Sequence, residues 1–177
     1  MVDSTPIAIE TVSAGDEARL LPGLVALLQD TVASGASVGF LPPLSEEEAR
    51  DYWQTAFQSV ADGSRVLLVA YDADEIVGSV QLELAMRPNG LHRAEVQKLF
   101  VHQSQRRRGI GQALMHAVEQ AARERGRSLL VLDTRQGDNA ERLYRRLAYQ
   151  EVGVIPAYAL STTGTLDGTV YFYKIIS

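Results

Sequence analysis

The sequence predicts an α/β protein in which helices cover both faces of a mixed, mostly antiparallel sheet. About seven short segments are rich in Val, Ile and Leu, which is typical of strands. Four other segments repeat apolar residues at intervals of three and four, which is typical of amphipathic helices. The order is strand, two helices, three strands, helix, strand, helix and two strands. This order predicts one mixed sheet with helices on both faces.

Seven segments have the composition of strands, because β-branched and aromatic residues gather in them and turn residues bound them. The predicted strands cover residues 7–12, 65–71, 75–84, 94–101, 129–133, 149–155 and 169–175. Asp72-Ala73-Asp74 suits a tight hairpin, and Pro88-Asn89-Gly90 marks another turn. A Thr/Gly-rich loop over residues 156–168 separates the last two strands.

The first two helices have recognisable starts and ends. Apolar positions over residues 20–32 predict the first helix, which ends at Gly35. Pro22 belongs to its first turn or kinks its start. Ser45-Glu46-Glu47-Glu48 has the pattern of a capping box, in which the first and last residues satisfy each other's backbone donors. The second helix therefore begins there, and Gly63 ends it.

The other two helices lie in the second half of the chain. The third follows a glycine-containing turn and runs to about Arg125, where Gly126 caps it. The fourth covers residues 140–148, with Asp138 or Asn139 as its N-cap.

Length and composition favour a single domain over residues 1–177, because 46% of the residues are hydrophobic and 22% are charged. The net charge of −5 disfavours a nucleic-acid-binding protein. The absence of cysteine excludes disulfides, a thiolate zinc site and an acyl-cysteine intermediate. The three histidines lack metal-ligand spacing, so no metal is expected. No secretion signal or apolar membrane span is recognisable, which favours the cytoplasm over a membrane.

The most informative segment is the strand AEVQKLFV followed by R-R-R-G-I-G-Q-A-L and an amphipathic helix. A glycine turn at a helix N-terminus presents free backbone N–H groups and the positive end of the helix dipole, which suits a pyrophosphate. A P-loop would need Gly-Lys-Ser/Thr where this chain has Gly111-Gln112-Ala113. The Rossmann fingerprint would need a small residue at Leu114, after an opening βαβ unit that is missing here.

This segment resembles the GNAT family of N-acetyltransferases, whose signature is Gln/Arg-x-x-Gly-x-Gly/Ala; Arg106, Gly109 and Gly111 match it. The segment 143–149 also fits the family. The resemblance covers essentially the whole chain.

Within the family, the chain is most similar to the tabtoxin-resistance acetyltransferases. The segments that support this closer resemblance are GASVGF (35–40), PNGLHRAEVQKL (88–99) and LLVLDT (129–134). It implies acetyl-CoA as donor and the amine of a toxic β-lactam amino acid as substrate. The N-terminal helices and the 156–168 loop depart from it, which leaves the amine substrate open.

The resemblance implies which residues bind the coenzyme. Backbone N–H groups of residues 107–112 would hold the pyrophosphate, while Leu99 and Val101 would pair with pantetheine. Arg106 and Arg108 would add charge, although a triple arginine can also be a solvated surface run. The predicted coenzyme-binding residues are Leu99, Phe100, Val101, Arg106, Arg107, Arg108, Gly109, Ile110, Gly111, Gln112, Asn139 and Tyr144.

The predicted catalytic residues are Tyr144, Glu95 and Asp133. The family makes Tyr144 the general acid that protonates the departing thiolate. Periodicity alone would make it a half-buried aromatic beside the core residue Leu143. Glu95 and Asp133 lie on adjacent strands and can converge to bind the amine or remove its proton. In the alternative interpretation Glu95 faces solvent and Asp133 is a turn residue. Backbone N–H groups near Leu99 and Phe100 would stabilise the oxyanion.

The sequence therefore predicts an N-acetyltransferase that acts on the primary amine of a small molecule, by direct attack in a ternary complex, with toxin resistance as the implied role. The alternatives are a protein or peptide N-acetyltransferase and a non-catalytic sensor of acyl-CoA. A peptide substrate would need an open groove where this chain has the loops 33–43 and 156–168. The resemblance is compatible with a homodimer.

Overall fold

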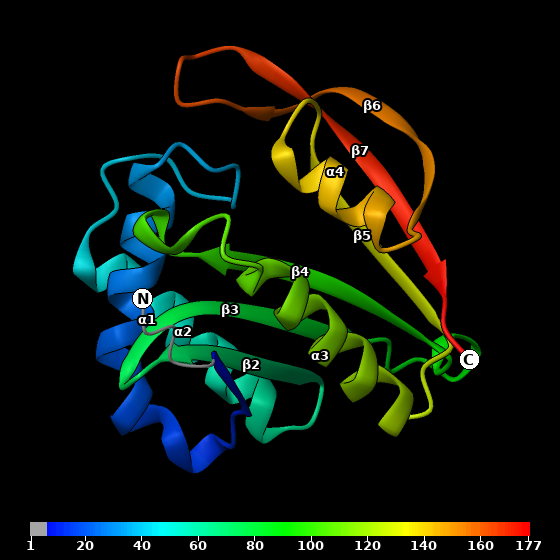
Figure 1. Ribbon diagram of the computed structural model, residues 1–177, viewed down its shortest axis with the longest axis horizontal. Coiled ribbons are helices and arrows are strands. Elements are labelled where there is room, and N and C mark those ends of the chain that lie inside the picture. The colour runs from blue at the N-terminus through cyan, green and yellow to red at the C-terminus, as the bar shows by residue number, and fades with distance from the viewer. Residues whose placement is uncertain (1–6) are drawn as a thin grey trace, which may run out of the picture.

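The computed structural model describes residues 7–177, which form seven strands and four α-helices in one mixed sheet architecture (Figure 1). The strands are β1 (Ala8–Thr11), β2 (Arg65–Asp72), β3 (Glu75–Leu84), β4 (Arg93–Val101), β5 (Leu129–Arg135), β6 (Gln150–Leu160) and β7 (Leu166–Ile175). The α-helices are α1 (Glu17–Ala33), α2 (Glu46–Ala61), α3 (Ile110–Glu124) and α4 (Asn139–Arg146). The predicted fold class and order of elements are confirmed.

The sheet has the order β1-β2-β3-β4-β5-β7-β6 and is antiparallel except between β4 and β5. That parallel junction contains three residue pairs, the last of which is Glu95↔Val131. β4 nevertheless continues to Val101 and β5 to Arg135. The two strands meet at one end and diverge toward the other (Figure 1). The sheet therefore has an N-terminal arm, β1–β4, and a C-terminal arm, β5–β7, joined along a short seam.

Hydrophobic cores lie on both faces of the N-terminal arm. Alternation along β2 directs Leu67 and Val69 toward the core formed by α1 and α2, around the fully buried Trp53. Val66 and Leu68 point to the opposite core, which contains the apolar face of α3. This second core also includes side chains of β5, β7 and α4. It therefore holds the two arms together beyond the short seam.

Local signals explain where the first helices begin. The capping box of α2 is confirmed, because the Ser45 hydroxyl accepts a hydrogen bond from the Glu48 N–H at 3.2 Å while the Glu48 carboxylate accepts one from the Ser45 N–H at 3.1 Å. Pro22 lies beyond the first turn of α1. The helix starts at Glu17, three residues before Leu20, where the apolar pattern begins.

The loop predicted over residues 156–168 is wrong in its extent. β6 continues to Leu160 and β7 begins at Leu166, so the turn occupies only residues 161–165. A register shift between Ile155 and Ala159 lets the strand pass Pro156, which has no N–H to donate, and pairing resumes beyond it. The sequence pattern reveals the proline but not this resumed pairing, which depends on β7.

Candidate active site

The divergence of β4 and β5 opens a cavity of about 1010 Å³ between the two arms. Its size is at the upper end of the range for ligand sites, so it has room for a long coenzyme and a small second substrate. Every residue predicted for the site lines this cavity except Arg108. The predicted residues that line the cavity are Glu95, Leu99, Phe100, Val101, Arg106, Arg107, Gly109, Ile110, Gly111, Gln112, Asp133, Asn139 and Tyr144.

β4 contains a bulge where it passes the cavity. Lys98 and Leu99 on β4 oppose the single residue Val80 on β3. Lys98 has φ +53, a left-handed conformation that costs a non-glycine residue roughly 1 kcal/mol. Beyond Glu95 the edge of β4 that faces β5 pairs with no strand among residues 7–177. Backbone polar groups near Leu99 and Phe100 are therefore available to a ligand in the cavity.

The N-terminus of α3 forms one end of the cavity. Gly109 is its N-cap with φ +81, which glycine adopts without the Cβ penalty. The first helical hydrogen bond joins the Ala113 N–H to the Gly109 carbonyl at 3.0 Å, so the N–H groups of residues 110–112 have no helical partner. A Cβ added at Gly111 would lie 3.5 Å from Leu143, which shows that α4 packs against this turn. The turn is therefore suited to bind a phosphate.

The three arginines before α3 have different partners. Arg106 donates to the Ser34 hydroxyl at 2.8 Å and so links the end of β4 to the end of α1. Arg108 pairs with Asp72 at 2.6 Å and does not line the cavity. Arg107 lines the cavity and, within residues 7–177, has no hydrogen bond or ion pair from its guanidinium. Of the three, Arg107 is the one available to a bound anion.

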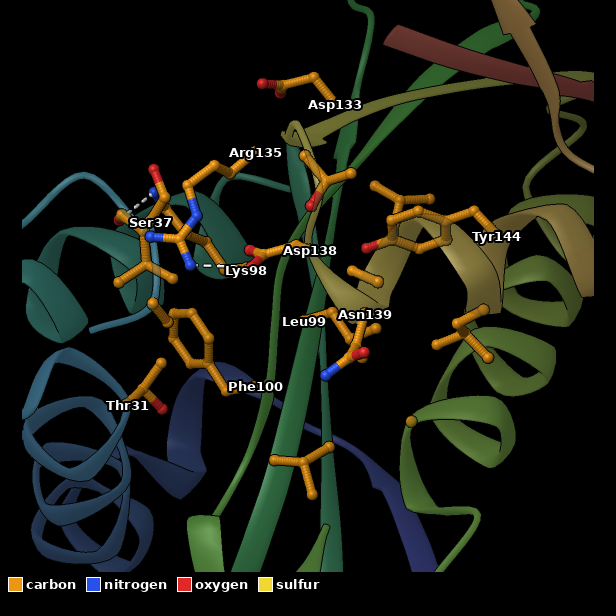
Figure 2. Close-up of a pocket in the computed structure, with 18 of the residues that line it drawn as sticks. Thr31, Ser37, Lys98, Leu99, Phe100, Asp133, Arg135, Asp138, Asn139 and Tyr144 are labelled. Carbon is orange, nitrogen blue, oxygen red and sulfur yellow. Dashed lines mark hydrogen bonds and ion pairs between the residues drawn. The ribbon is translucent and has the colours of Figure 1, made fainter. Parts of the chain in front are cut away.

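Tyr144 comes from α4, and its ring borders the cavity (Figure 2). The residue is only 6% exposed, and its ring lies 5.9 Å from the rings of Tyr149 and Phe172. Its hydroxyl has no hydrogen-bond partner among the described residues. Burial raises the pKa of Tyr144, and the Asp133 and Asp138 carboxylates raise it further, so the phenol keeps its proton at neutral pH. The ring is thus more buried than periodicity predicts, while Leu143 is only partly buried.

Two carboxylates line the cavity from opposite arms. Glu95 on β4 accepts a hydrogen bond from the Gln97 amide at 3.0 Å, and this amide also contacts Glu83. Asp133 on β5 accepts one from the Thr169 hydroxyl at 2.7 Å. Burial raises the pKa of Glu95, and the Glu83 and Asp133 carboxylates add to this rise. A carboxylate with a raised pKa is a better proton acceptor near neutral pH than an ordinary one.

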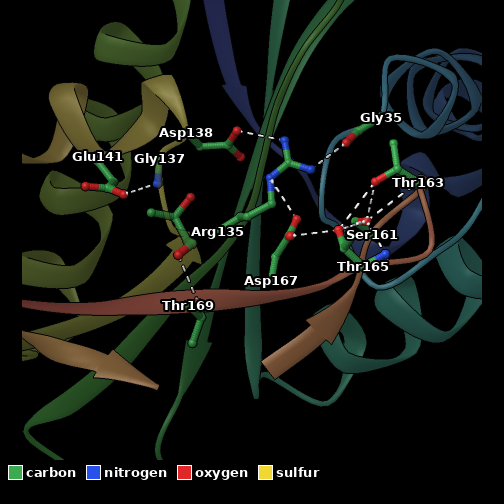
Figure 3. A network of polar contacts seen from close by, with 11 residues as sticks. Gly35, Arg135, Gly137, Asp138, Glu141, Ser161, Thr163, Thr165, Asp167 and Thr169 are labelled. Carbon is green, nitrogen blue, oxygen red and sulfur yellow. Dashed lines mark hydrogen bonds and ion pairs between the residues drawn. The ribbon is translucent and has the colours of Figure 1, made fainter. Parts of the chain in front are cut away.

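Two cations that the sequence pattern does not single out connect the loop after α1 to the sheet. Arg135 donates to the Gly35 carbonyl at 3.0 Å and pairs with Asp138 at 2.8 Å (Figure 3). Lys98 donates to the Val38 carbonyl at 2.7 Å. Strand alternation from Asp133 could have indicated Arg135, two positions further on. No local signal indicates Lys98, because its direction depends on the bulge.

Two further features of residues 7–177 bear on function. No group of three or more His, Cys, Asp or Glu side chains in this range could hold a metal ion. No helix in the same range is long and apolar enough to cross a membrane.

Comparisons with known proteins agree on one family. A sequence model of the Acetyltransferase (GNAT) family matches residues 31–149. An uncharacterized N-acetyltransferase from the hisH-hisA intergenic region of Azospirillum brasilense is 32% identical over 138 residues, which is 77% of this chain and 78% of the relative. The L-methionine sulfoximine/L-methionine sulfone acetyltransferase of Pseudomonas aeruginosa is 24% identical, with the same shares covered. A Salmonella typhimurium protein assigned as an acetyltransferase, solved with acetyl-CoA, is 14% identical and superposes with a TM-score of 0.76, covering 98% of this chain and 95% of that one.

Proposed function

The chain belongs to the GNAT family of acetyltransferases, and we propose that it transfers the acetyl group of acetyl-CoA to the primary amine of a small, amino-acid-like molecule. The main support is that one cavity combines an anion site, an unpaired strand edge and two carboxylates. We call the region lined by residues 99–101, 106, 107 and 109–112 the coenzyme part. The region lined by residues 36–39, 95–98 and 133–135 is the amine part.

The coenzyme part fits acetyl-CoA, which supplies an acetyl group activated as a thioester. The N–H groups of residues 110–112 and the Arg107 guanidinium would bind the pyrophosphate. The free edge of β4 after Glu95 would pair with the pantetheine amides, as an added strand does. Asn139, at the first turn of α4, lines the same region and would contact the coenzyme.

The amine part supplies the groups for proton transfer. Glu95 or Asp133 would attract the substrate ammonium and take one proton from it, directly or through a water. The free amine would then attack the thioester carbonyl carbon. Backbone N–H groups near Leu99 and Phe100 would stabilise the negative charge on the carbonyl oxygen. Tyr144 would donate its proton to the sulfur as the carbon–sulfur bond breaks. The second proton of the attacking nitrogen would return to the Tyr144 phenolate, directly or through a water, so the products are the N-acetyl compound and the free thiol.

The relative from Pseudomonas aeruginosa acts, by its name, on derivatives of an amino acid, which supports an acceptor of this class. A β-lactam amino acid of the tabtoxinine type, and hence a role in toxin resistance, is the most specific form of the proposal. A peptide substrate is less favoured, because the loop 34–43 and the β6–β7 hairpin both contribute to the cavity wall. A non-catalytic sensor would not need Tyr144 and two carboxylates around one space.

A substrate screen tests the proposal. Thiol release from acetyl-CoA should be measured with amino acids, β-lactam amino acids, polyamines and short peptides. We expect turnover with amino-acid-like amines. Turnover restricted to peptides would assign the alternative activity, and coenzyme binding without turnover on any amine would indicate a sensor.

A further inference from the structure

Lys98 differs from the other lysine of the chain in its electrostatic surroundings. Lys174 pairs with the carboxylate of Glu119 at 2.8 Å. Lys98 has no carboxylate within ion-pair distance among residues 7–177, and its hydrogen-bond partner there is the neutral carbonyl of Val38, at 2.7 Å. An ammonium has three donors, so most of the hydrogen-bonding capacity of Lys98 is left for a ligand.

The Lys98 ammonium lies in the amine part of the cavity rather than in open solvent. Its side chain is partly buried and lines the cavity, on the side opposite the Tyr144 ring (Figure 2). Burial lowers the pKa of Lys98, while the Asp133 and Glu95 carboxylates counter this shift. An anion that reaches a partly desolvated cation is bound more strongly than one that meets an exposed lysine.

The neighbouring cation cannot fill the same role. Arg135 reaches the same loop, but its guanidinium already pairs with Asp138 at 2.8 Å and lies 4.0 Å from Asp167 (Figure 3). Its charge is therefore balanced within the protein. Lys98 also belongs to the amine part, but it forms no direct ion pair with any residue in the range 7–177. Its charge is therefore left for a ligand.

We propose that Lys98 binds a carboxylate of the amine substrate, so that the preferred substrate is a zwitterionic amino acid rather than a simple amine. The inference rests on the proposed function and specifies its substrate class. Glu95 and Asp133 would hold the ammonium of the zwitterion while Lys98 holds its carboxylate. The β4 bulge then has two uses, because it leaves the N–H groups near Leu99 available and turns Lys98 toward the 35–39 loop. An amine without a carboxylate would leave Lys98 without a charged partner.

The test compares matched substrates that differ in the carboxylate. Kinetics should be measured for several α-amino acids, methionine sulfone among them, and for their carboxamides. We expect the wild-type protein to prefer the acids in kcat/KM, mainly through KM. In Lys98→Met we expect kcat/KM for the acids to fall by about ten- to a hundredfold, the usual effect of losing a hydrogen bond to a charged group, with little change for the carboxamides. Lys98→Arg should keep the preference for acids in part.

Acetyl-CoA affinity and melting temperature of each variant are the controls for folding. A wild-type protein that acetylates carboxamides as well as acids would overturn the proposal. So would a Lys98→Met variant that loses activity on acids and carboxamides equally, because this is the result of a purely structural contact with the loop. If Lys98→Met does not fold, the comparison of acids with carboxamides in the wild type and in Lys98→Arg still tests the proposal. Failure to acetylate any amine would instead reject the proposed function, and this inference with it.

Discussion

The coenzyme part and the amine part of the cavity differ in how the chain builds them. The coenzyme part comes mainly from one segment of the chain, between Leu99 and Gln112, and would use mainly the backbone N–H groups at the start of α3. The amine part uses side chains that distant segments bring together, as in the hydrogen bond between Arg135 and Gly35, a hundred residues apart. Backbone groups at a helix N-terminus bind many phosphates alike. Side chains of opposite charge, such as Lys98 and Glu95, can select one substrate.

Tyr144 is the proposed general acid, so its substitution should have the largest effect on chemistry. In Tyr144→Phe we expect kcat to fall by about ten- to a thousandfold, because the ring stays and only the transferable proton is lost. Acetyl-CoA affinity and melting temperature should hardly change, since the hydroxyl has no hydrogen-bond partner among residues 7–177. Wild-type kcat in this variant would remove Tyr144 from the mechanism.

Removing a carboxylate should affect only the amine part. In Glu95→Gln and in Asp133→Asn we expect kcat/KM for the amine to fall by roughly ten- to a hundredfold, because each amide keeps the shape but cannot take a proton or attract an ammonium. Coenzyme affinity, measured by calorimetry, should stay the same. The double variant should be worse than either single one. Equal losses of coenzyme affinity and amine turnover would show that the two parts are not separable.

The converse change should affect only the coenzyme part. In Gly109→Val the side chain has open space, but φ +81 strains a β-branched residue by about 1–2 kcal/mol. We expect about tenfold weaker acetyl-CoA binding with unchanged kcat at saturation. Gly126→Val is a matched control, because Gly126 has φ +68 and open space but lies at the far end of α3. Equal acetyl-CoA affinity in the two variants would contradict the proposal that the pyrophosphate binds at the N-terminus of α3.

The smallest expected effect is on the pH profile. A base acts when deprotonated, so kcat/KM rises as pH passes upward through its pKa. Burial raises the pKa of Glu95, and the rising limb should therefore lie at higher pH than for an ordinary glutamate. Glu95→Gln should remove this limb, whereas a limb that persists unchanged would belong to Asp133 or to the substrate amine.

The same comparison explains what the sequence could predict. The capping box at Ser45 and the glycine turn at Gly109 are local signals, so α2 and the start of α3 were predictable. The cavity residues from Leu99 to Gln112 followed from one motif. Lys98 could not be recognised, because its direction depends on a bulge against β3. The predicted loop between β6 and β7 was too long for a similar reason, because the register of β6 depends on its pairing with β7 across the sheet.

The central claim is that both substrates occupy one cavity and that the acetyl group passes directly between them. It is tested most directly in a single turnover with isotopically labelled acetyl-CoA and an α-amino acid, followed by mass spectrometry of the protein and of the small molecules. We expect the label on the nitrogen of the amino acid, in an amount equal to the thiol released, and no label on the protein at any time. Label on a protein side chain, or label recovered only as acetate, would contradict the account.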